Sequence, residues 1–222
     1  MRYTTILFDS DDTLLDFKAS EREAIYRAFE RAGLPFDEAI RCDYSEINHG
    51  LWKALERGEV TTDELLVLRF ERLFEKYSYT YDPKGMNDLY FSCLSETAFT
   101  MDGAIEVLEY LKDRYELDII TNGVGYIQTS RLGNADIRKY INKLFISGEI
   151  GASKPSPAFF DYVLDNLDEK DKSRILVIGD SLTSDIKGAC LAGLDSVYIG
   201  KDKGEYSPTY TVSHIRELKK LL

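Results

Sequence analysis

The sequence has few of the residues that cross-link small secreted domains or bind soft metal ions. Its 222 residues include only three cysteines and two histidines. Cys42, Cys93 and Cys190 lie far apart and form no CxxC pair. This pattern argues against a disulfide framework and against a zinc site, and it suits a reducing compartment. We therefore expect a cytoplasmic protein.

Long apolar runs and an excess of basic residues are also missing. No stretch approaches the roughly 18 apolar residues of a membrane-spanning helix, and the apolar run before Asp9 is too short for a signal peptide. The 28 basic residues are outnumbered by 39 acidic ones, which gives a formal net charge of −11. This charge argues against nucleic-acid polymers and anionic membranes as partners.

A small phosphorylated metabolite is nevertheless compatible with the negative charge, because one metal ion and one lysine can reverse the field locally. We expect such a metabolite as the ligand. The chain is expected to be a monomer or a small homo-oligomer.

What the sequence does contain is a series of short apolar segments separated by helical patterns. Nearly continuous apolar runs, typical of parallel strands covered on both faces, occur at residues 3–8, 117–121, 143–147, 174–178 and 196–199. Helical patterns occur between them at residues 103–115, 126–135, 157–167 and 184–192. This alternation predicts an α/β fold with a doubly wound parallel sheet.

One long stretch interrupts the alternation. It shows no strand pattern, and helices are predicted within it at residues 20–32, 44–57, 62–76 and 86–96. Thr61, followed by Asp63 and Glu64, is a favourable helix start. We expect an inserted all-α domain at residues 16–98 and an α/β core made of residues 1–15 and 99–222. The alternative is that these helices simply cover the sheet.

Polar side chains follow four of the predicted strands. Ligands of open parallel sheets bind beside the carboxyl ends of the strands, so we expect these side chains to meet at one edge. They are Asp9, Asp11, Thr121, Asn122, Lys154, Asp180 and Asp185.

The types of side chain in this set suit phosphoryl transfer. Clustered carboxylates without Cys or His select a hard cation, and Mg²⁺ commonly takes one or two carboxylates together with waters and a substrate phosphate. One carboxylate can attack phosphorus, while a second can act as general acid and then as general base. A hydroxyl and an ammonium group can stabilise the phosphoryl oxygens and balance their charge.

The four strand ends resemble the four motifs of the haloacid dehalogenase (HAD) superfamily. These motifs are DxDxT from Asp9, a threonine at Thr121, Lys-Pro at Lys154 and GDSxxxD from Gly179, and they occur here in the order of that superfamily. The insertion after the first motif resembles its C1-type helical cap. The resemblance implies a Rossmann-like HAD core with a helical cap. Ser10 departs from the pattern, since this position is usually apolar, and we expect little effect from it.

The resemblance also implies roles for the motif residues. Asp9 would be the nucleophile, forming an aspartyl-phosphate, and a Mg²⁺ ligand. Asp11 would be the general acid/base and would contact the metal through its backbone carbonyl. Thr121 and Asn122 would bind phosphoryl oxygens, and Lys154 would balance the charge of nucleophile and phosphate.

Two further acidic residues complete the metal site that the resemblance implies. Asp180 would ligate Mg²⁺, and Asp185 would orient the metal or its water. Alternatively, Asp185 would only stabilise the first turn of a helix. Asp12 and Asp16 are expected to shape the turn and the cap hinge. The second aspartate of the first motif, Asp11, favours a phosphatase, because the carbon–halogen dehalogenases of the superfamily lack it.

The cap segments at residues 47–52, 56–58 and 65–70 resemble one subgroup, the bacterial pyrimidine 5′-nucleotidases. A nucleotide base needs an aromatic surface and polar groups for its edge. Asn48, Trp52 and Arg69 are the candidates for these contacts. Alternatively, Trp52 belongs to the core of the cap and Arg69 to a solvated face.

The predicted function is therefore Mg²⁺-dependent hydrolysis of a small phosphomonoester, a nucleoside 5′-monophosphate being the favoured substrate. The alternatives are a phosphatase for phosphoglycolate or a sugar phosphate, a β-phosphoglucomutase-like isomerase and a non-catalytic binding module. No cap residue that would steer Asp11 toward isomerisation is evident. Intact Asp11 and Lys154 argue against a site that only binds.

Overall fold

The computed structural model describes residues 2–202 and 204–222 and divides into two compact units. One unit combines the residues up to Phe17 with those from Ala98 onward, and the other is Lys18–Thr97. The expected boundaries, after residues 15 and 98, fall close to these divisions. The chain therefore leaves the first unit after Phe17, before its second strand, and returns to it once at Ala98.

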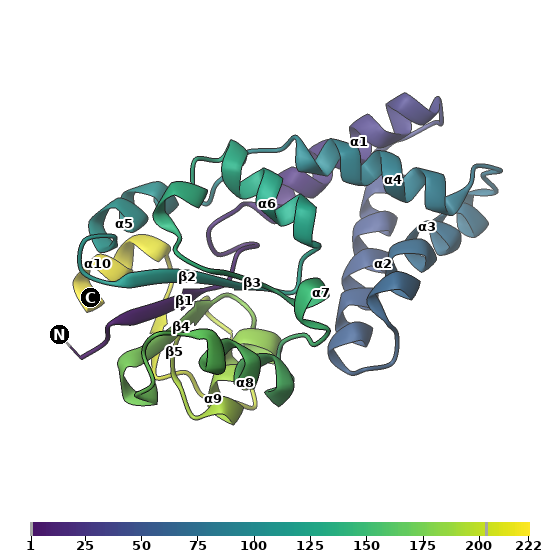
Figure 1. Cartoon of the computed structure of the whole chain (residues 1–222). Coiled ribbons are helices and arrows are strands. Elements are labelled where there is room, and N and C mark those ends of the chain that lie inside the picture. The colour runs from purple at the N-terminus through teal and green to yellow at the C-terminus, as the bar shows by residue number, and fades with distance from the viewer. Residues whose placement is uncertain (1, 203) are drawn as a thin grey trace. The chain divides into compact units, whose positions relative to one another are not determined.

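The first unit is built around a parallel sheet, which has six strands among the described residues (Figure 1). They are β1 (Thr5–Phe8), β2 (Glu116–Thr121), β3 (Leu144–Ile146), β4 (Ile175–Gly179), β5 (Asp195–Ile199) and β6 (Tyr210–Val212). Their spatial order is β3-β2-β1-β4-β5-β6. The order reverses beside β1, which is where doubly wound sheets bind ligands. The predicted fold class is confirmed, and β6 is an addition to it.

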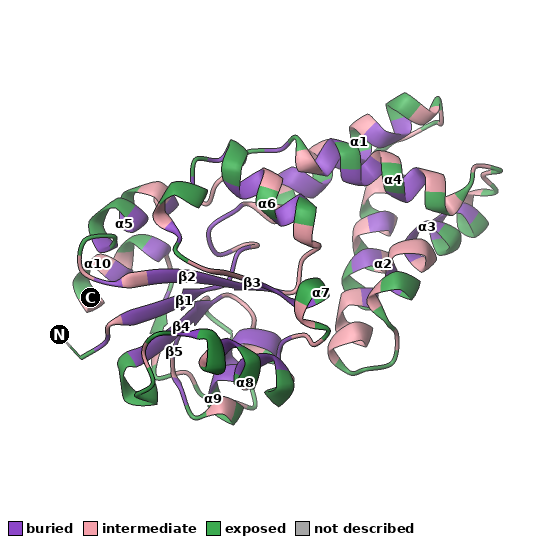
Figure 2. Ribbon diagram, viewed as in Figure 1, coloured by how far each residue is buried: buried purple, intermediate pink, exposed green. Residues whose placement is uncertain are grey.

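Helices cover both faces of this sheet (Figure 1). They are α5 (Ala104–Leu111), α6 (Gly125–Asn134), α7 (Ser147–Ile150), α8 (Pro157–Asn166), α9 (Lys187–Ala192) and α10 (Leu218–Leu221). Ile6 and Phe8 of β1 share one apolar cluster with residues of α5 and α6. Leu7 points to the other face and shares a second cluster with Phe159 and Phe160 of α8. The central strands β1, β2 and β4 lie between these layers and are almost wholly buried (Figure 2).

The second unit is helical. It contains α2 (Glu38–Glu56), α3 (Thr62–Tyr77), α4 (Pro83–Ser95) and nearly all of α1 (Phe17–Ala32). The predicted start of α3 is confirmed: the Thr61 hydroxyl accepts from the Glu64 backbone N–H, and the Glu64 carboxylate accepts from the Thr61 N–H at 2.8 Å. Helix α2 begins earlier than predicted because Asp37 caps it and accepts from the Ile40 N–H at 2.9 Å.

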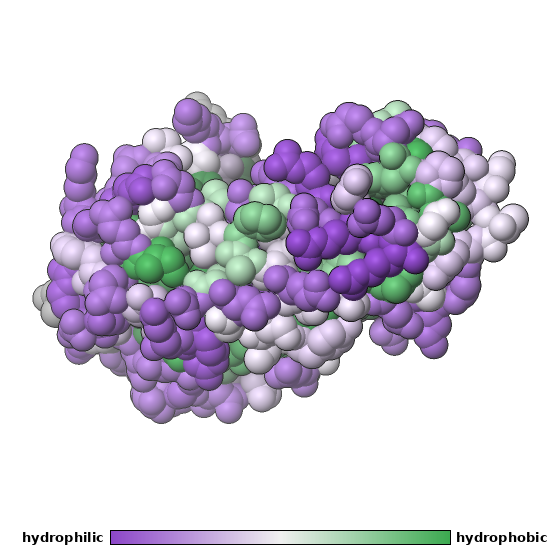
Figure 3. Space-filling view, turned by 90° about the horizontal axis from the view of Figure 1, so that it is seen from above, coloured by the Kyte–Doolittle hydropathy of each residue, from purple (hydrophilic) through white to green (hydrophobic). Residues whose placement is uncertain are grey.

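The surface is largely hydrophilic in the view of Figure 3. On this face, apolar side chains form separate patches. Among the described residues, none of the helices has the length and apolar character needed to cross a membrane.

Asp118 is a buried carboxylate in the middle of β2. Its Oδ1 accepts from the Lys143 backbone N–H at 2.8 Å, whereas Oδ2 has no hydrogen-bond partner among the described residues. Burial raises the pKa of Asp118 to about 6, and the bond from Lys143 opposes this only in part. The charged form is therefore held in the fold at a cost in free energy.

Asp118→Asn should raise the free energy of unfolding by about 1–2 kcal/mol at pH of about 8. The folded pKa lies above the unfolded value, so this group favours folding at low pH, and that contribution is lost as the pH rises through about 6. The gain from asparagine should therefore vanish at pH of about 4. Urea unfolding at both pH values, with the exposed Asp161→Asn as control, measures this. An equal gain at both pH values would contradict it.

Candidate active site

The register of the central strands brings three strand ends level with one another. Phe8 of β1 is paired with Ile119 of β2 and with Ile178 of β4. The backbone N–H of Asp9 donates to the Ile178 carbonyl at 2.8 Å. Side chains that follow these strands therefore emerge at one edge of the sheet, as the sequence predicted.

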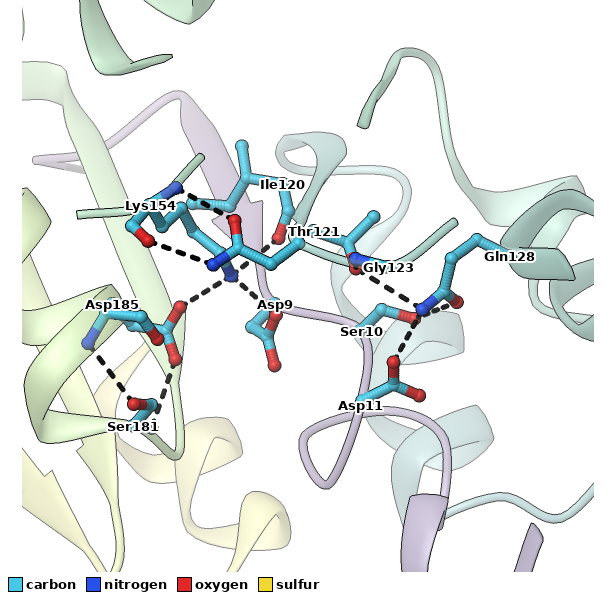
Figure 4. A network of polar contacts seen from close by, with 12 residues as sticks. Asp9, Ser10, Asp11, Ile120, Thr121, Gly123, Gln128, Lys154, Ser181 and Asp185 are labelled. Atoms are coloured by element: carbon cyan, nitrogen blue, oxygen red, sulfur yellow. Dashed lines mark hydrogen bonds and ion pairs between the residues drawn. The ribbon is translucent and has the colours of Figure 1, made fainter. Parts of the chain in front are cut away.

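Lys154 is buried among the carboxylates at this edge (Figure 4). Its Nζ donates to Asp9 Oδ1 at 2.6 Å, to Asp185 Oδ1 at 2.7 Å and to the carbonyl oxygen of Ile120 at 2.9 Å. Burial by itself would lower the pKa of Lys154, but Asp185 and Asp9 outweigh it and hold the pKa above its usual value. The lysine is therefore a fixed cation that bridges two acidic residues from different strand ends.

Asp9 lies in an environment that penalises its charge. Burial raises the pKa of Asp9 well above its ordinary value; Lys154 opposes this rise, and Asp185 and Asp180 add to it. Candidate ligand oxygens of Asp9, Asp180 and Asp185 lie within 4.8 Å of one another. The ammonium of Lys154 gives one positive charge against these three carboxylates, so a divalent cation would balance the remainder. An all-oxygen set of this kind fits Mg²⁺.

Asp185 is fixed by its own loop as well as by Lys154. It lies in a π-helical turn at Leu182–Ile186 and is fully buried. Its Oδ2 accepts from the Ser181 backbone N–H at 3.0 Å. A Cβ at Gly179 would come within 2.2 Å of that oxygen, so only glycine leaves room for this carboxylate. Asp185 therefore does more than stabilise a helix terminus, because it binds the central lysine.

Asn122 has a different environment from the one expected. Its side-chain amide donates to the Lys154 carbonyl at 2.9 Å and accepts from the Lys154 N–H at 2.8 Å. The amide thus holds the backbone of the lysine, and binding of a phosphoryl oxygen by Asn122 stays a prediction. Thr121 is buried at the end of β2, and its Oγ1 accepts from the Gly123 N–H at 3.1 Å.

Asp11 is held by two residues that the sequence analysis missed. Gln128 Nε2 donates to Asp11 Oδ2 at 2.5 Å, and Arg131 Nη1 donates to Asp11 Oδ1 at 2.6 Å. Both residues lie on α6, three positions apart and almost fully buried. The sequence pattern that could have indicated them is a pair of polar residues at helical spacing between the apolar Ile127 and Leu132.

Asp12 shapes the turn that follows the first motif. It adopts the left-handed conformation with φ of 57°, which aspartate tolerates better than most residues. Its Oδ1 accepts from the Phe17 backbone N–H at 3.1 Å. Its position agrees with the expected structural role.

The substrate-binding candidates of the helical unit are not gathered at an exposed site. Asn48 and Arg69 are only 2% and 1% exposed. Arg69 donates to Asn48 Oδ1 at 3.3 Å and to Asn87 Oδ1 at 2.6 Å, and its guanidinium lies 4.7 Å from the Tyr90 ring centroid. Asn48 in turn donates to Glu21 at 2.7 Å. The interpretation of Arg69 as a solvated face is wrong, because it belongs to a buried polar network.

Trp52, the third candidate, is partly buried on α2. Binding of a substrate by Trp52, Asn48 or Arg69 stays a prediction. For Asn48 and Arg69, the observed contacts support a role in holding α2, α3 and α4 together.

Comparison with known proteins gives a consistent family assignment. Residues 3–193 match the model of the haloacid dehalogenase-like hydrolases. The HAD-hydrolase YfnB of Bacillus subtilis is 37% identical, with 100% of this chain and 96% of YfnB covered. A crystal structure of YfnB bound to magnesium has a TM-score of 0.95 and covers 100% of this chain and 99% of that one.

Two further relatives are pyrimidine 5′-nucleotidases. The pyrimidine 5′-nucleotidase PynA of Streptococcus pneumoniae is 34% identical, with 98% of this chain and 94% of PynA covered. The pyrimidine 5′-nucleotidase YjjG of Escherichia coli is 32% identical, with 100% of this chain and 99% of YjjG covered. The resemblance drawn from the four motifs and the cap segments is thereby confirmed.

Proposed function

The chain belongs to the haloacid dehalogenase-like hydrolases, and we propose that it is a magnesium-dependent phosphatase that acts on a small phosphomonoester through Asp9. The observation that carries this proposal is the contact of the Asp9 carboxylate with the buried ammonium of Lys154 at 2.6 Å. Asp11, two residues further on, would supply the second carboxyl group that acid–base chemistry needs.

In the first step, an Asp9 oxygen attacks phosphorus and the bond from phosphorus to the ester oxygen breaks. Asp11 gives a proton to that leaving oxygen, so the alcohol departs neutral. Lys154 neutralises the Asp9 carboxylate and the approaching phosphate without competing as a nucleophile, since its pKa is held above the usual value. Thr121 would donate its hydroxyl hydrogen to a phosphoryl oxygen.

In the second step, water attacks phosphorus of the aspartyl-phosphate and the bond from phosphorus to the Asp9 oxygen breaks. Asp11, now a carboxylate, accepts a proton from the water, so both Asp9 and Asp11 return to their starting states. The products are the alcohol and inorganic phosphate. Asp11 favours this cycle over dehalogenation, which needs no acid for its halide leaving group.

The metal site of this proposal consists of residues already described. Asp9, Asp180 and Asp185 would hold Mg²⁺, with the Asp11 backbone carbonyl as the further contact implied by the family resemblance. When bound, the ion supplies positive charge for the carboxylates and for the phosphoryl oxygens. The magnesium in the YfnB structure supports this assignment.

We propose a nucleoside 5′-monophosphate as the substrate and Lys18–Thr97 as the cap that selects it. The support is the similarity along the whole chain to PynA and YjjG, both pyrimidine 5′-nucleotidases. The aspartates and lysine at the strand ends read only the phosphate group, so the alcohol portion must be recognised elsewhere. Phosphoglycolate and sugar phosphates are the alternative substrates.

Phosphate release from a panel of esters tests this function. The panel holds pyrimidine and purine nucleoside 5′-monophosphates, phosphoglycolate and a sugar phosphate, each assayed with Mg²⁺ and with EDTA. We expect turnover in the presence of Mg²⁺ and none in EDTA, and the highest turnover on a pyrimidine nucleotide. Turnover that persists in EDTA would contradict the metal assignment, and preference for another ester would contradict the substrate assignment.

A further inference from the structure

The amide of Gln128 connects three residues of the first two motifs. We propose that Gln128 is a positioning residue that holds Asp11 and Thr121 in register, and that Ser10 completes this arrangement by satisfying the other end of the same amide. The inference rests on the proposed function, in which Asp11 is the acid and base. It assigns a purpose to Ser10, the position at which this chain departs from its family's usual pattern.

The contacts of Gln128 use both ends of its amide (Figure 4). Nε2 donates to Asp11 Oδ2 at 2.5 Å and to Thr121 Oγ1 at 3.3 Å. Oε1 accepts from Ser10 Oγ at 3.1 Å. Gln128 and Ser10 are 1% and 0% exposed, so water cannot easily replace these partners. The single amide on α6 thus contacts both the segment that follows β1 and the end of β2.

The chemistry of the partners fixes which way the amide faces. When Asp11 is ionised, its carboxylate only accepts hydrogen bonds, so the amide presents its NH₂ group to it in this state. The carbonyl oxygen Oε1 then points the other way and is buried, where it needs a donor. Ser10 supplies that donor. An apolar side chain at this position would leave Oε1 unsatisfied, at a cost of about 1–3 kcal/mol.

The backbone has left space for this side chain. A Cβ at Gly123 would lie 2.2 Å from Gln128 Nε2 and 2.7 Å from its Cγ. Gly123 therefore lets Gln128 pass directly over the loop that carries Thr121. Arg131, one turn further along α6, holds the other oxygen of Asp11 at 2.6 Å. Both carboxylate oxygens of Asp11 are thus fixed from one helix.

The functional consequence is alignment. Asp11 must reach the ester oxygen while Thr121 contacts the phosphoryl group, and both are set by the same amide. Loss of this amide should leave ester binding nearly intact, because the hydrogen-bond partners of Gln128 are Ser10, Asp11 and Thr121 and include neither the nucleophile nor Lys154. It should slow the chemical steps, which depend on alignment to within a fraction of an ångström.

The test is a double-mutant cycle with Gln128→Met, which keeps the length of the side chain, and Ser10→Ala. We expect Gln128→Met to lower kcat by about 10- to 100-fold with KM changed by less than about 3-fold. Ser10→Ala should lower kcat by about 3- to 10-fold, and the double variant should resemble Gln128→Met alone. Thr129→Ala, on the exposed side of α6, should match the wild type.

Two results would overturn the proposal: a Gln128→Met protein with unchanged kcat, or losses that simply multiply in the double variant. Asp11→Asn in the same assay tests the proposed function separately. It should inactivate the enzyme whether or not Gln128 positions Asp11, so an active Asp11→Asn protein would mean that the proposed function itself is wrong. Crystal structures of the wild type and Gln128→Met give a readout that needs no turnover. The Asp11 side chain should occupy one conformation in the wild type and a different position in Gln128→Met. An Asp11 side chain in the same position in both structures would also overturn the proposal.

Discussion

Asp9→Asn is expected to fold normally and to lose turnover of phosphate esters by about 10⁴-fold or more. The amide has the shape of the carboxylate but is a far weaker nucleophile, so the covalent step fails. Stability should not fall, because burial already raises the pKa of Asp9 and makes its charge costly. Steady-state phosphate release and thermal unfolding measure the two effects.

Asp12→Asn is the matched control for this variant. Asparagine also tolerates the left-handed conformation at position 12 and keeps the acceptor for the Phe17 N–H. This variant should retain turnover within a few-fold. An Asp9→Asn protein as active as Asp12→Asn would exclude Asp9 as the nucleophile.

Lys154→Met is expected to have the second largest effect, and it should act on both activity and stability. Turnover should fall by about 10³-fold, because the charge of Asp9 and of the incoming phosphate loses its fixed cation. The free energy of unfolding should fall by about 3–5 kcal/mol at pH of about 8, because Asp9 and Asp185 then lie buried without their partner.

The loss of stability in Lys154→Met should shrink at lower pH. The pKa of Asp9 is raised in the folded protein, so acidification neutralises this carboxylate while the fold persists. Urea unfolding at pH of about 8 and about 5 measures the difference. Lys172→Met is the control, since Lys172 is exposed and donates to the Ala192 carbonyl. A loss that is the same at both pH values would contradict a role of Lys154 in charge balance.

Features that follow from local sequence patterns were predicted well. The central strands are continuous apolar runs, and the residues that follow them converge because parallel strands end at one edge. Asp9, Lys154 and Asp185 therefore meet as expected. Strand β6 escaped prediction because Tyr210–Val212 lies at one end of the strand order and is partly exposed, so it does not form a continuous apolar run.

Features set by the packing of distant elements were not predicted. Gln128 and Arg131 are polar residues on a buried helix face, and only the fold reveals that this face meets Asp11. Asn48 and Arg69 have polar side chains that suit a ligand, but their partners are other residues of the helical unit. Spacing along one helix cannot distinguish a face that binds a ligand from one that binds another helix.

Mass spectrometry of the Asp9 peptide tests the central claim most directly. The Asp11→Asn protein, incubated with Mg²⁺ and a nucleoside 5′-monophosphate and then acid-quenched, should carry the mass of one phosphoryl group on Asp9. Without the acid the label should form slowly, so the incubation is long, and the label should persist because the base that activates water is missing as well. The Asp9→Asn protein treated in the same way should carry none. A phosphoryl group on another residue, or phosphate release by the wild type with no label on Asp9 in the trapped variant, would contradict the aspartyl-phosphate mechanism.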